Sequence, residues 1–416
     1  MTTPSVTVAD ADPIRALRTE QLVWFGEEDP RPVQTLIDLA PAELVAASIA
    51  DEPDQGAYQG VYGVWPLQVT VPGPVALDVA GLTWVGVHPD HRRKGILTAM
   101  LRDHFERVHA DPALHLSVLQ ASEPAIYGRH GYGMAGTELA VSLGRGTTLT
   151  APGLEPDAER IRTSLVTIRD GNIAERLQLL EKRIAATQLA SVVGDARFYR
   201  DVTTQSPEDL RGTERTQALF AQVDGEDVGV ATFDRKHKWE LGRPAGELTV
   251  HRLIGTPAAR FALLRRLVDF DLMSTIRLQC ADQLVVDWVG GPRRTSSLTT
   301  LDGIWFRLVD LAEGLAQRRY ATSCDVVVDV TDKACPWNAG TWRITTTADG
   351  SAETTRSGQE PDIHLDVAAL GAAYLGAGSL VTMLRAGLIS EKTPGAVHRL
   401  WGAMRSDEPL VAGRGF

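Results

Sequence analysis

The sequence contains few cysteines, no long apolar run and no excess of basic residues. Only three cysteines occur among 416 residues, Cys280, Cys324 and Cys335, and no CxxC spacing joins them. Neither a disulfide framework nor a zinc site is indicated, and buried thiols are the favoured interpretation. No apolar stretch approaches the roughly 18 residues of a membrane span, and the N-terminal MTTPSVTVADADPIRALRTE carries acids instead of an apolar signal segment. We therefore expect a cytoplasmic protein.

The charge balance argues against a general nucleic-acid binder. The formal net charge is -11, which mildly favours cationic partners, although many proteins are acidic only for solubility. The hydrophobic share of 44% is that of an ordinary globular protein. Because a single core rarely organises so long a chain, we expect two or three domains.

The N-terminal part of the chain alternates between helical and strand-like patterns. Apolar spacing predicts helices over residues 41–50 and 97–108, and strands over 60–64, 67–71, 81–87 and 114–120. The Gly, Thr and Pro-rich GRGTTLTAPG that follows is typical of a linker. This pattern indicates a mixed α/β unit.

The middle of the chain resembles a degenerate copy of the first part. It is predicted to contain a helix over 173–185, a hairpin over 218–233 that turns at Asp224 and Gly225, a strand over 247–254 and a helix that begins at Pro257. Its segment LTVHRLIGTPAARFALLRRL follows the order of LTWVGVHPDHRRKGILTAML, without the basic loop. The likeness is weak, because strand–loop–helix units are common.

A third pattern begins near residue 301. We expect a helix over 306–318, a strand over 325–330, a hairpin from 341–347 and 351–356, and the small-residue helix LDVAALGAAYLG. The predicted fold class is therefore α/β (α+β), with domains over residues 1–148, 149–300 and 301–416.

The loop in VGVHPDHRRKGILTAM is the clearest sign of function. It lies between a strand and a helix, so Arg92, Arg93, Lys94 and Gly95 are expected at a helix N-terminus, where free N–H groups bind anions. Gly95 lets the backbone approach a phosphate closely. The loop is neither a Walker loop nor a GxGxxG turn. Its spacing favours a pyrophosphate ligand; a solvated basic helix start is the alternative.

Two motifs resemble those of the GNAT acetyltransferase superfamily. The first is RxxG in the basic loop, where Leu97 replaces the usual third Gly or Ala. The second is ASEPAIYGRHGYGMA, in which a tyrosine precedes a Gly-aromatic pair. Their order and separation predict an N-terminal GNAT domain. Metal ligation by His88 and His91 is not indicated.

The whole chain is similar to the Eis (enhanced intracellular survival) acetyltransferases of actinobacteria, through these motifs, CPWNAGTWRI and a C-terminal phenylalanine. The resemblance implies a GNAT domain, a central degenerate GNAT-like domain without a cofactor site and a C-terminal sterol-carrier-protein-like domain. It also implies a homohexamer that uses acetyl-CoA, without a metal, to acetylate amines such as aminoglycosides, polyamines and lysine.

The resemblance assigns roles to individual residues. Tyr127 is expected to be the general acid, and the terminal carboxylate of Phe416 the base. The residues expected to contact acetyl-CoA are Val85, Gly86, Val87, Arg93, Lys94, Gly95, Ile96, Leu97, Thr98, Ser122 and Glu123. Glu27, Glu28 and Trp84 are candidates for binding the acceptor, with a solvated face and core packing as the respective alternatives. Tyr132 is expected to serve packing, and the cysteines lie outside the N-terminal domain, which disfavours an acyl-cysteine route.

Three functions remain open on the sequence. The favoured one is an acetyl-CoA-dependent N-acetyltransferase that acts on a cationic amine, with neither a nucleic acid nor a membrane as partner. The second is a non-catalytic protein that binds a lipid or another small molecule and carries a vestigial GNAT domain. The third is a protein-lysine acetyltransferase.

Overall fold

The computed structural model describes residues 5–24, 31–50, 56–169, 172–205, 210 and 212–411. The chain divides into two compact units. The first comprises Met1–Gly136 and Ile304–Glu408, and the second comprises Thr137–Gly303 and the segment that starts at Pro409. Within the described residues, no helix is long and apolar enough to cross a membrane.

The first unit is built on a largely antiparallel sheet with strand order β1-β2-β3-β4-β5-β17-β6. The strands are β1 (Val6–Asp10), β2 (Glu43–Ile49), β3 (Gly60–Val71), β4 (Val75–Val87), β5 (Leu116–Gln120), β17 (Ile304–Leu308) and β6 (Gly133–Met134). Only the neighbours β4 and β5 run parallel, and helix α3 (Ile96–Ala110) connects them. A parallel pair needs such a crossover.

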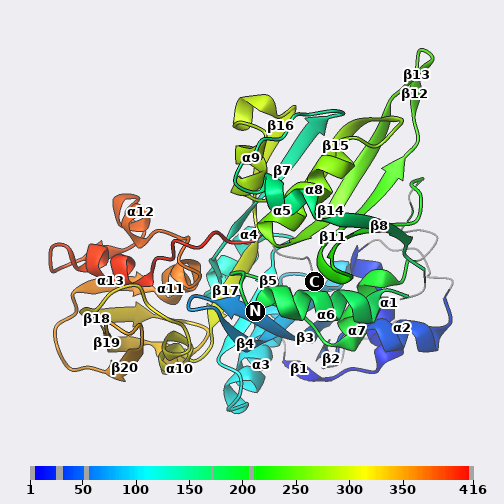
Figure 1. Cartoon of the computed structure of the whole chain (residues 1–416). Helices are drawn as coiled ribbons and strands as arrows, with labels where there is room; N and C mark the ends of the chain where they lie inside the picture. Colours follow the sequence, from blue (N-terminus) through cyan, green and yellow to red (C-terminus); the bar gives the residue numbers. More distant parts are fainter. Residues whose placement is uncertain are drawn as a thin grey trace. The chain divides into compact units, whose positions relative to one another are not determined.

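Helices cover both faces of this sheet (Figure 1). A Cβ on Gly60 would meet Ile96 and Met100 of α3, whereas a Cβ on Gly86 would meet Val23 of α1 (Pro13–Trp24). Gly86 pairs with residue 61, next to Gly60, and successive residues of a strand point to opposite faces. Helices α1 and α3 therefore pack on opposite sides. Helix α2 (Val33–Leu39) contacts α1.

Two helices predicted from the sequence are corrected. Residues 41–50 form strand β2, because β1 and β3 pair with it on both sides and tertiary pairing overrides a helical pattern. Of residues 306–318, the first part forms β17, which pairs with β5, and the helix α10 is confined to Leu311–Ala316. The predicted helix over 97–108 is confirmed by α3.

The C-terminal part of the first unit forms a separate sheet, of order β20-β19-β18-β21-β22. Its strands are β18 (Cys324–Thr331), β19 (Gly340–Thr346), β20 (Ala352–Arg356), β21 (Ile363–Asp366) and β22 (Ser390–Glu391), and its later helices are α11 (Val367–Ala373), α12 (Leu380–Arg385) and α13 (Ala396–Met404). The predicted strand over 325–330 and the hairpin that follows are confirmed. Buried Arg318 links the C-terminal ends of α11 and α13 by donating hydrogen bonds to the carbonyls of Tyr374 and Met404.

The second unit repeats the order of the first around a sheet β16-β7-β15-β14-β11-β10-β8. The strands are β16 (Ser297–Asp302), β7 (Thr137–Gly144), β15 (Met273–Ala281), β14 (Gly246–Gly255), β11 (Glu226–Lys236), β10 (Gln217–Val223) and β8 (Arg162–Thr167). Its helices include α5 (Glu155–Glu159), α6 (Ala174–Ala185), α7 (Ala196–Thr203), α8 (Pro257–Leu267) and α9 (Gln283–Trp288). Again the parallel pair, β14 and β15, is joined by a helix, α8.

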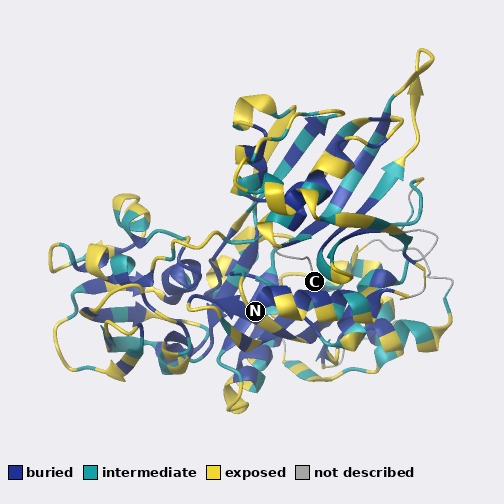
Figure 2. Ribbon diagram, viewed as in Figure 1, coloured by how far each residue is buried: buried dark blue, intermediate teal, exposed yellow. Residues whose placement is uncertain are grey.

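Strand β7 belongs to this second sheet because it pairs with β15 and β16, although its residues lie before the boundary expected at 148. Figure 2 shows the buried residues concentrated along the strands and on the inner faces of the helices. The hairpin predicted to turn at Asp224 and Gly225 is confirmed by β10 and β11.

Candidate active site

A cleft opens in the first unit where β4 and β5 diverge. The two strands pair only at Ala80 with Ser117 and at Gly81 with Val118. Beyond them, Trp84 has a positive φ of 52°, and the register between β3 and β4 shifts at this point. Such a bulge bends a strand away from its neighbour. The backbone of residues 85–87 thereby becomes one wall of an open cleft.

The basic loop closes one end of this cleft at the N-terminus of α3. Gly95 is the N-cap residue, with φ at 85°, and no side chain caps the helix. The first N–H groups of α3 are therefore available to an anion. Arg92 and Arg93 are exposed beside them, whereas the Lys94 ammonium lies 3.3 Å from Nδ1 of His91. The loop thus combines backbone donors with positive charge.

The cleft has a volume of about 790 Å³, within the range of small-molecule sites. It brings together most residues that the resemblance assigned to acetyl-CoA. The lining residues are Val23, Trp24, Val85, Gly86, Val87, Arg92, Arg93, Gly95, Ile96, Leu97, Thr98, Ser122, Glu123, Ile126, Tyr127, Arg129 and His130. Lys94 and Trp84 are not among the described lining residues; Trp84 is half-buried at the bulge.

Sequence reasoning missed several lining residues, among them Val23 and Trp24 at the end of α1, and Arg129 and His130 after Tyr127. Trp24 is 46% exposed, a property that the sequence does not show. Arg129 and His130 stand inside the quoted YGRHGYG motif. Burial lowers the pKa of His130, with Arg129 and Arg307 adding to the effect, which favours the neutral imidazole.

Tyr127 ends the short helix α4 (Pro124–Tyr127), and its side chain is poised for a ligand. The residue is only 6% exposed yet lines the cleft. Among the described residues, none forms a hydrogen bond with its hydroxyl, which is therefore free to donate to a bound molecule. Burial, together with the nearby charge of Glu123, raises its pKa to about 12. The phenol stays protonated throughout the physiological range.

A buried chain of hydrogen bonds lies behind Tyr127. The ring of Tyr132 meets that of Tyr127 edge-on, with centroids 5.9 Å apart. The Tyr132 hydroxyl is 2.7 Å from Oγ of Ser117, which is 2.7 Å from Nε2 of His104. Burial and then the charge of Arg107 lower the pKa of His104 to about 3, so its imidazole is neutral. Tyr132 packs in the core, as expected, and its hydroxyl is also fixed.

The C-terminal part of the first unit supports the site loop directly. Buried Arg307 of β17 pairs with Asp332 at 2.7 Å, and the Asn338 amide of the CPWNAG segment also donates to Asp332. A Cβ on Gly131 would lie 2.8 Å from the Arg307 guanidinium, and one on Gly133 would overlap the backbone of α11. The glycines of the GYG motif thus permit this close packing.

Three predicted site residues, Glu27, Glu28 and Phe416, lie outside the described residues. The two cysteines with described side chains are buried, and neither is among the residues that line the cleft. Burial raises the pKa of Cys335 to about 12 and that of Cys324 to about 11, so neither is a ready nucleophile.

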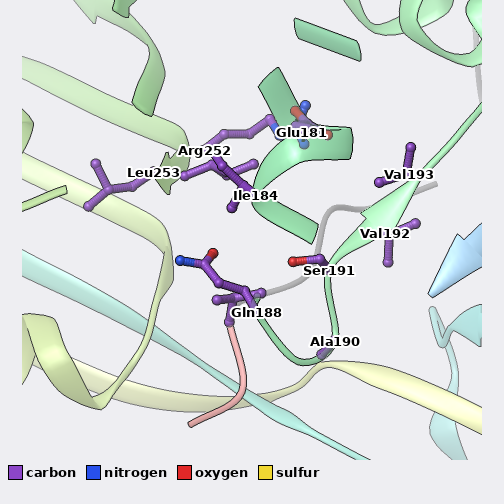
Figure 3. Close-up of a pocket in the computed structure, with 11 residues that line it drawn as sticks. Glu181, Ile184, Gln188, Ala190, Ser191, Val192, Val193, Arg252 and Leu253 are labelled. Carbon is purple, nitrogen blue, oxygen red and sulfur yellow. Dashed lines mark ion pairs between the residues drawn. The ribbon is translucent and has the colours of Figure 1, made fainter. Parts of the chain in front are cut away.

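The matching region of the second unit is filled by protein side chains. Strand β14 carries a register shift next to His251, just as β4 does at Trp84. The pocket beyond it, shown in Figure 3, holds about 20 Å³, space for roughly one water. The Arg252 guanidinium lies 2.6 Å from the Glu181 carboxylate, whose other oxygen accepts from the Tyr199 hydroxyl.

The N-terminus of α8 also differs from that of α3. Its N-cap Thr256 accepts a hydrogen bond from the Ala259 N–H, and Pro257 occupies the first turn. Because a proline has no N–H and a side chain satisfies another donor, this helix end offers fewer groups to a phosphate. No arginine or lysine stands between β14 and α8.

Comparisons with known proteins identify the class of protein. A model described as an acetyltransferase (GNAT) domain matches residues 44–135, and one described as a sterol carrier protein domain matches residues 311–412. An uncharacterized N-acetyltransferase of Streptomyces avermitilis is 36% identical over 368 residues, 85% of each chain. N-acetyltransferase Eis of Mycobacterium tuberculosis is 28% identical over 351 residues, 83% of this chain and 82% of its own.

The architecture is shared as well. The crystal structure of Eis1 from Mycobacterium abscessus superposes with a TM-score of 0.80 at 26% identity, covering 99% of this chain and 100% of that one. The fold and the cleft therefore define an N-acetyltransferase with an N-terminal GNAT domain and a C-terminal sterol-carrier-like domain. The chain belongs to the Eis family of N-acetyltransferases. The mixed α/β fold class predicted from the sequence is confirmed.

Proposed function

We propose that the enzyme transfers the acetyl group of acetyl-CoA directly to a primary amine in the cleft of the first unit. The observation that carries this proposal is the cleft itself. It joins a helix N-terminus flanked by arginines to a tyrosine hydroxyl that has no hydrogen-bond partner among the described residues. Among the residues expected to contact the cofactor, those from Arg93 to Thr98 would hold the pyrophosphate. The free strand edge at 85–87 would hold the pantetheine arm, and Ser122 and Glu123 would add backbone contacts.

The chemistry needs a neutral amine and a way to stabilise the departing thiolate. The amine nitrogen bonds to the acetyl carbon, the carbon–sulfur bond breaks, and the nitrogen loses a proton to a base. We assign the hydrogen bond to the sulfur to Tyr127, whose hydroxyl is protonated and unpaired within the described residues. A phenol with a pKa of about 12 is a weaker acid than a thiol, near 8.5. Tyr127 therefore acts mainly by donating a hydrogen bond as charge develops on sulfur, and any proton it gives up returns from the amine.

For the base, we propose the terminal carboxylate of Phe416, on the family likeness. A carboxylate with an ordinary pKa near 3.5 is weak for this task, so desolvation or a relay through water must assist it. The acceptor is proposed to be a cationic small molecule, such as an aminoglycoside or a polyamine, or else lysine. Trp24 at the cleft offers an aromatic face to a cation; Trp84, Glu27 and Glu28 stay predictions.

Two further properties are proposed. The chain is expected to assemble into a homohexamer, on the family likeness alone. Only the first unit is expected to bind coenzyme A, which the small pocket of the second unit supports. The cytoplasmic location stays a prediction, as does the absence of nucleic-acid and membrane partners.

The decisive experiment measures thiol release from acetyl-CoA against a panel of aminoglycosides, polyamines and lysine peptides. We expect release with at least one small cationic amine, and mass spectrometry should show an added acetyl group on it. Release with lysine peptides alone would identify a protein acetyltransferase. No release with any amine, together with no coenzyme A binding by calorimetry, would contradict the assignment of the cleft.

A further inference from the structure

His130 lies in the cleft on the same face of a helical turn as Tyr127. Helix α4 passes directly into a single 3₁₀ turn, η2 (Gly128–His130), and both Tyr127 and Gly128 have right-handed helical dihedral angles. In such a turn, residues three apart in sequence lie one above the other, with Cβ atoms about 5–6 Å apart. Tyr127 and His130 have this spacing, and both line the cleft. One bound ligand can therefore contact both side chains.

The fold makes no use of the imidazole of His130. The residue is half-buried, and no described residue forms a hydrogen bond, an ion pair or a ring contact with it. By contrast, the imidazole of His104 is held by Ser117 at 2.7 Å, and that of His251 by Asp234 at 2.5 Å. Both ring nitrogens of His130 are therefore left for a bound molecule or for solvent.

The surroundings of His130 keep its imidazole neutral. Burial is the largest cause that lowers its pKa, and the guanidinium groups of Arg129 on the same turn and of Arg307 on β17 lower it further. Glu123 at the start of α4 also lines the cleft, and the pKa of His130 is lowered despite that negative charge. A neutral imidazole can accept a proton at pH 7, which complements the protonated phenol of Tyr127.

We propose that His130 is a catalytic residue of the acetyl transfer and accepts the proton that the attacking amine loses. The amine nitrogen bonds to the acetyl carbon, and its proton becomes acidic as positive charge develops on the nitrogen. That proton moves to a ring nitrogen of His130, and the imidazolium then releases it to solvent. The carbon–sulfur bond breaks with its electron pair going to sulfur, and the thiolate, hydrogen-bonded to Tyr127, later takes a proton from solvent. This inference rests on the proposed function and adds the proton acceptor whose help the weak terminal carboxylate requires.

The test is chemical rescue of His130→Ala on the full chain, with thiol release measured on a small amine that the wild type accepts. Removing the imidazole should lower kcat by about 10²-fold at about pH 7.5, with KM for acetyl-CoA unchanged, because the ring acts on the amine. Imidazole added at roughly 100 mM should raise the rate of this variant at least about tenfold, since a free imidazole can enter the vacated space and accept the proton. The matched variant His130→Phe fills that space, so imidazole should not rescue it.

Two controls separate a base from a structural residue. The fold rescue cancels the ionisation of the acceptor amine, and it should decline below about pH 6.5 as the added imidazole becomes protonated. His364→Ala removes an exposed histidine of the C-terminal sheet, whose ring lies 3.2 Å from Asp329. This variant should keep the wild-type kcat, and imidazole should stimulate neither it nor the wild type.

A wild-type kcat in His130→Ala would overturn the role of His130. A loss that imidazole does not restore, or restores equally in His130→Phe, would make the ring a packing element and overturn it too. A fold rescue that grows as the pH falls would show that the imidazolium acts as an acid, which also contradicts the proposal. In each of these cases the wild type still releases thiol, so the proposed function stands. A wild type that releases no thiol with any amine and binds no coenzyme A would instead overturn both.

Discussion

Replacing Tyr127 with phenylalanine separates chemistry from stability more cleanly than any other change in the site. The ring, which is almost wholly buried, is kept, and only a hydroxyl without a hydrogen-bond partner among the described residues is lost. We therefore expect the free energy of unfolding to change by less than about 0.5 kcal/mol. The hydroxyl's proposed bond to the departing sulfur exists only as charge develops, so kcat should fall by about 10²-fold, or about 2.7 kcal/mol, while KM for acetyl-CoA stays the same.

Tyr132→Phe is the matched control, because it makes the same chemical change in the neighbouring ring. Its hydroxyl is buried and bonded to Ser117, whose Oγ keeps its contact with His104, so the loss of this one hydrogen bond should cost about 0.5–1.5 kcal/mol of stability. Its hydroxyl does not line the cleft, so activity per folded molecule should stay within a few fold.

The assay follows thiol release at saturating acceptor, with urea unfolding of each variant at the same pH. Because the pKa of Tyr127 is about 12, the wild-type rate should show no loss from its ionisation below about pH 11. A Tyr127→Phe variant as active as the wild type would refute the assigned role. Equal losses of activity in both variants would show that the effect is not specific to the Tyr127 hydroxyl, which would also contradict the assigned role.

Four further experiments test the remaining assignments. Gly95→Glu should abolish coenzyme A binding, measured by calorimetry, because it places a carboxylate at the helix N-terminus. The positive φ of 85° at this position should cost the variant about 1–2 kcal/mol of stability. Unchanged affinity would contradict the assignment of the loop to the cofactor. Burial lowers the pKa of His104 to about 3, so between pH 6.5 and 3 the unfolded chain binds the extra proton and stability should fall with falling pH, by up to about 1.4 kcal/mol per unit. Urea unfolding at pH 7 and pH 5 measures this slope, which His104→Gln should reduce. Coenzyme A should titrate to one per chain, because the second unit's pocket holds only about 20 Å³, and two per chain would contradict that reading. A C-terminal amide on Phe416 should lower activity at least tenfold without unfolding the chain, whereas full activity would exclude the terminal carboxylate as base.

The sequence by itself determined the features that depend on short stretches of chain. The basic loop, the left-handed Gly95 and the helix after it follow from local spacing and backbone freedom, and all three are in the structure. The turn at Asp224 and Gly225 is equally local. A sequence motif predicted the position of Tyr127 after β5, and the structure places Tyr127 at the cleft.

Tertiary structure decided whatever depends on a partner distant in the chain. Residues 41–50 became a strand because β1 and β3 flank them, and β17 formed because β5 had a free edge, which no local pattern reports. The cleft exists because β4 and β5 part beyond Gly81. At the matching place of the second unit, Arg252 pairs with Glu181, and the pocket that the described residues leave there holds only about 20 Å³. Strand pairing and side-chain burial are set by which segments meet, and a sequence read in windows does not contain that information.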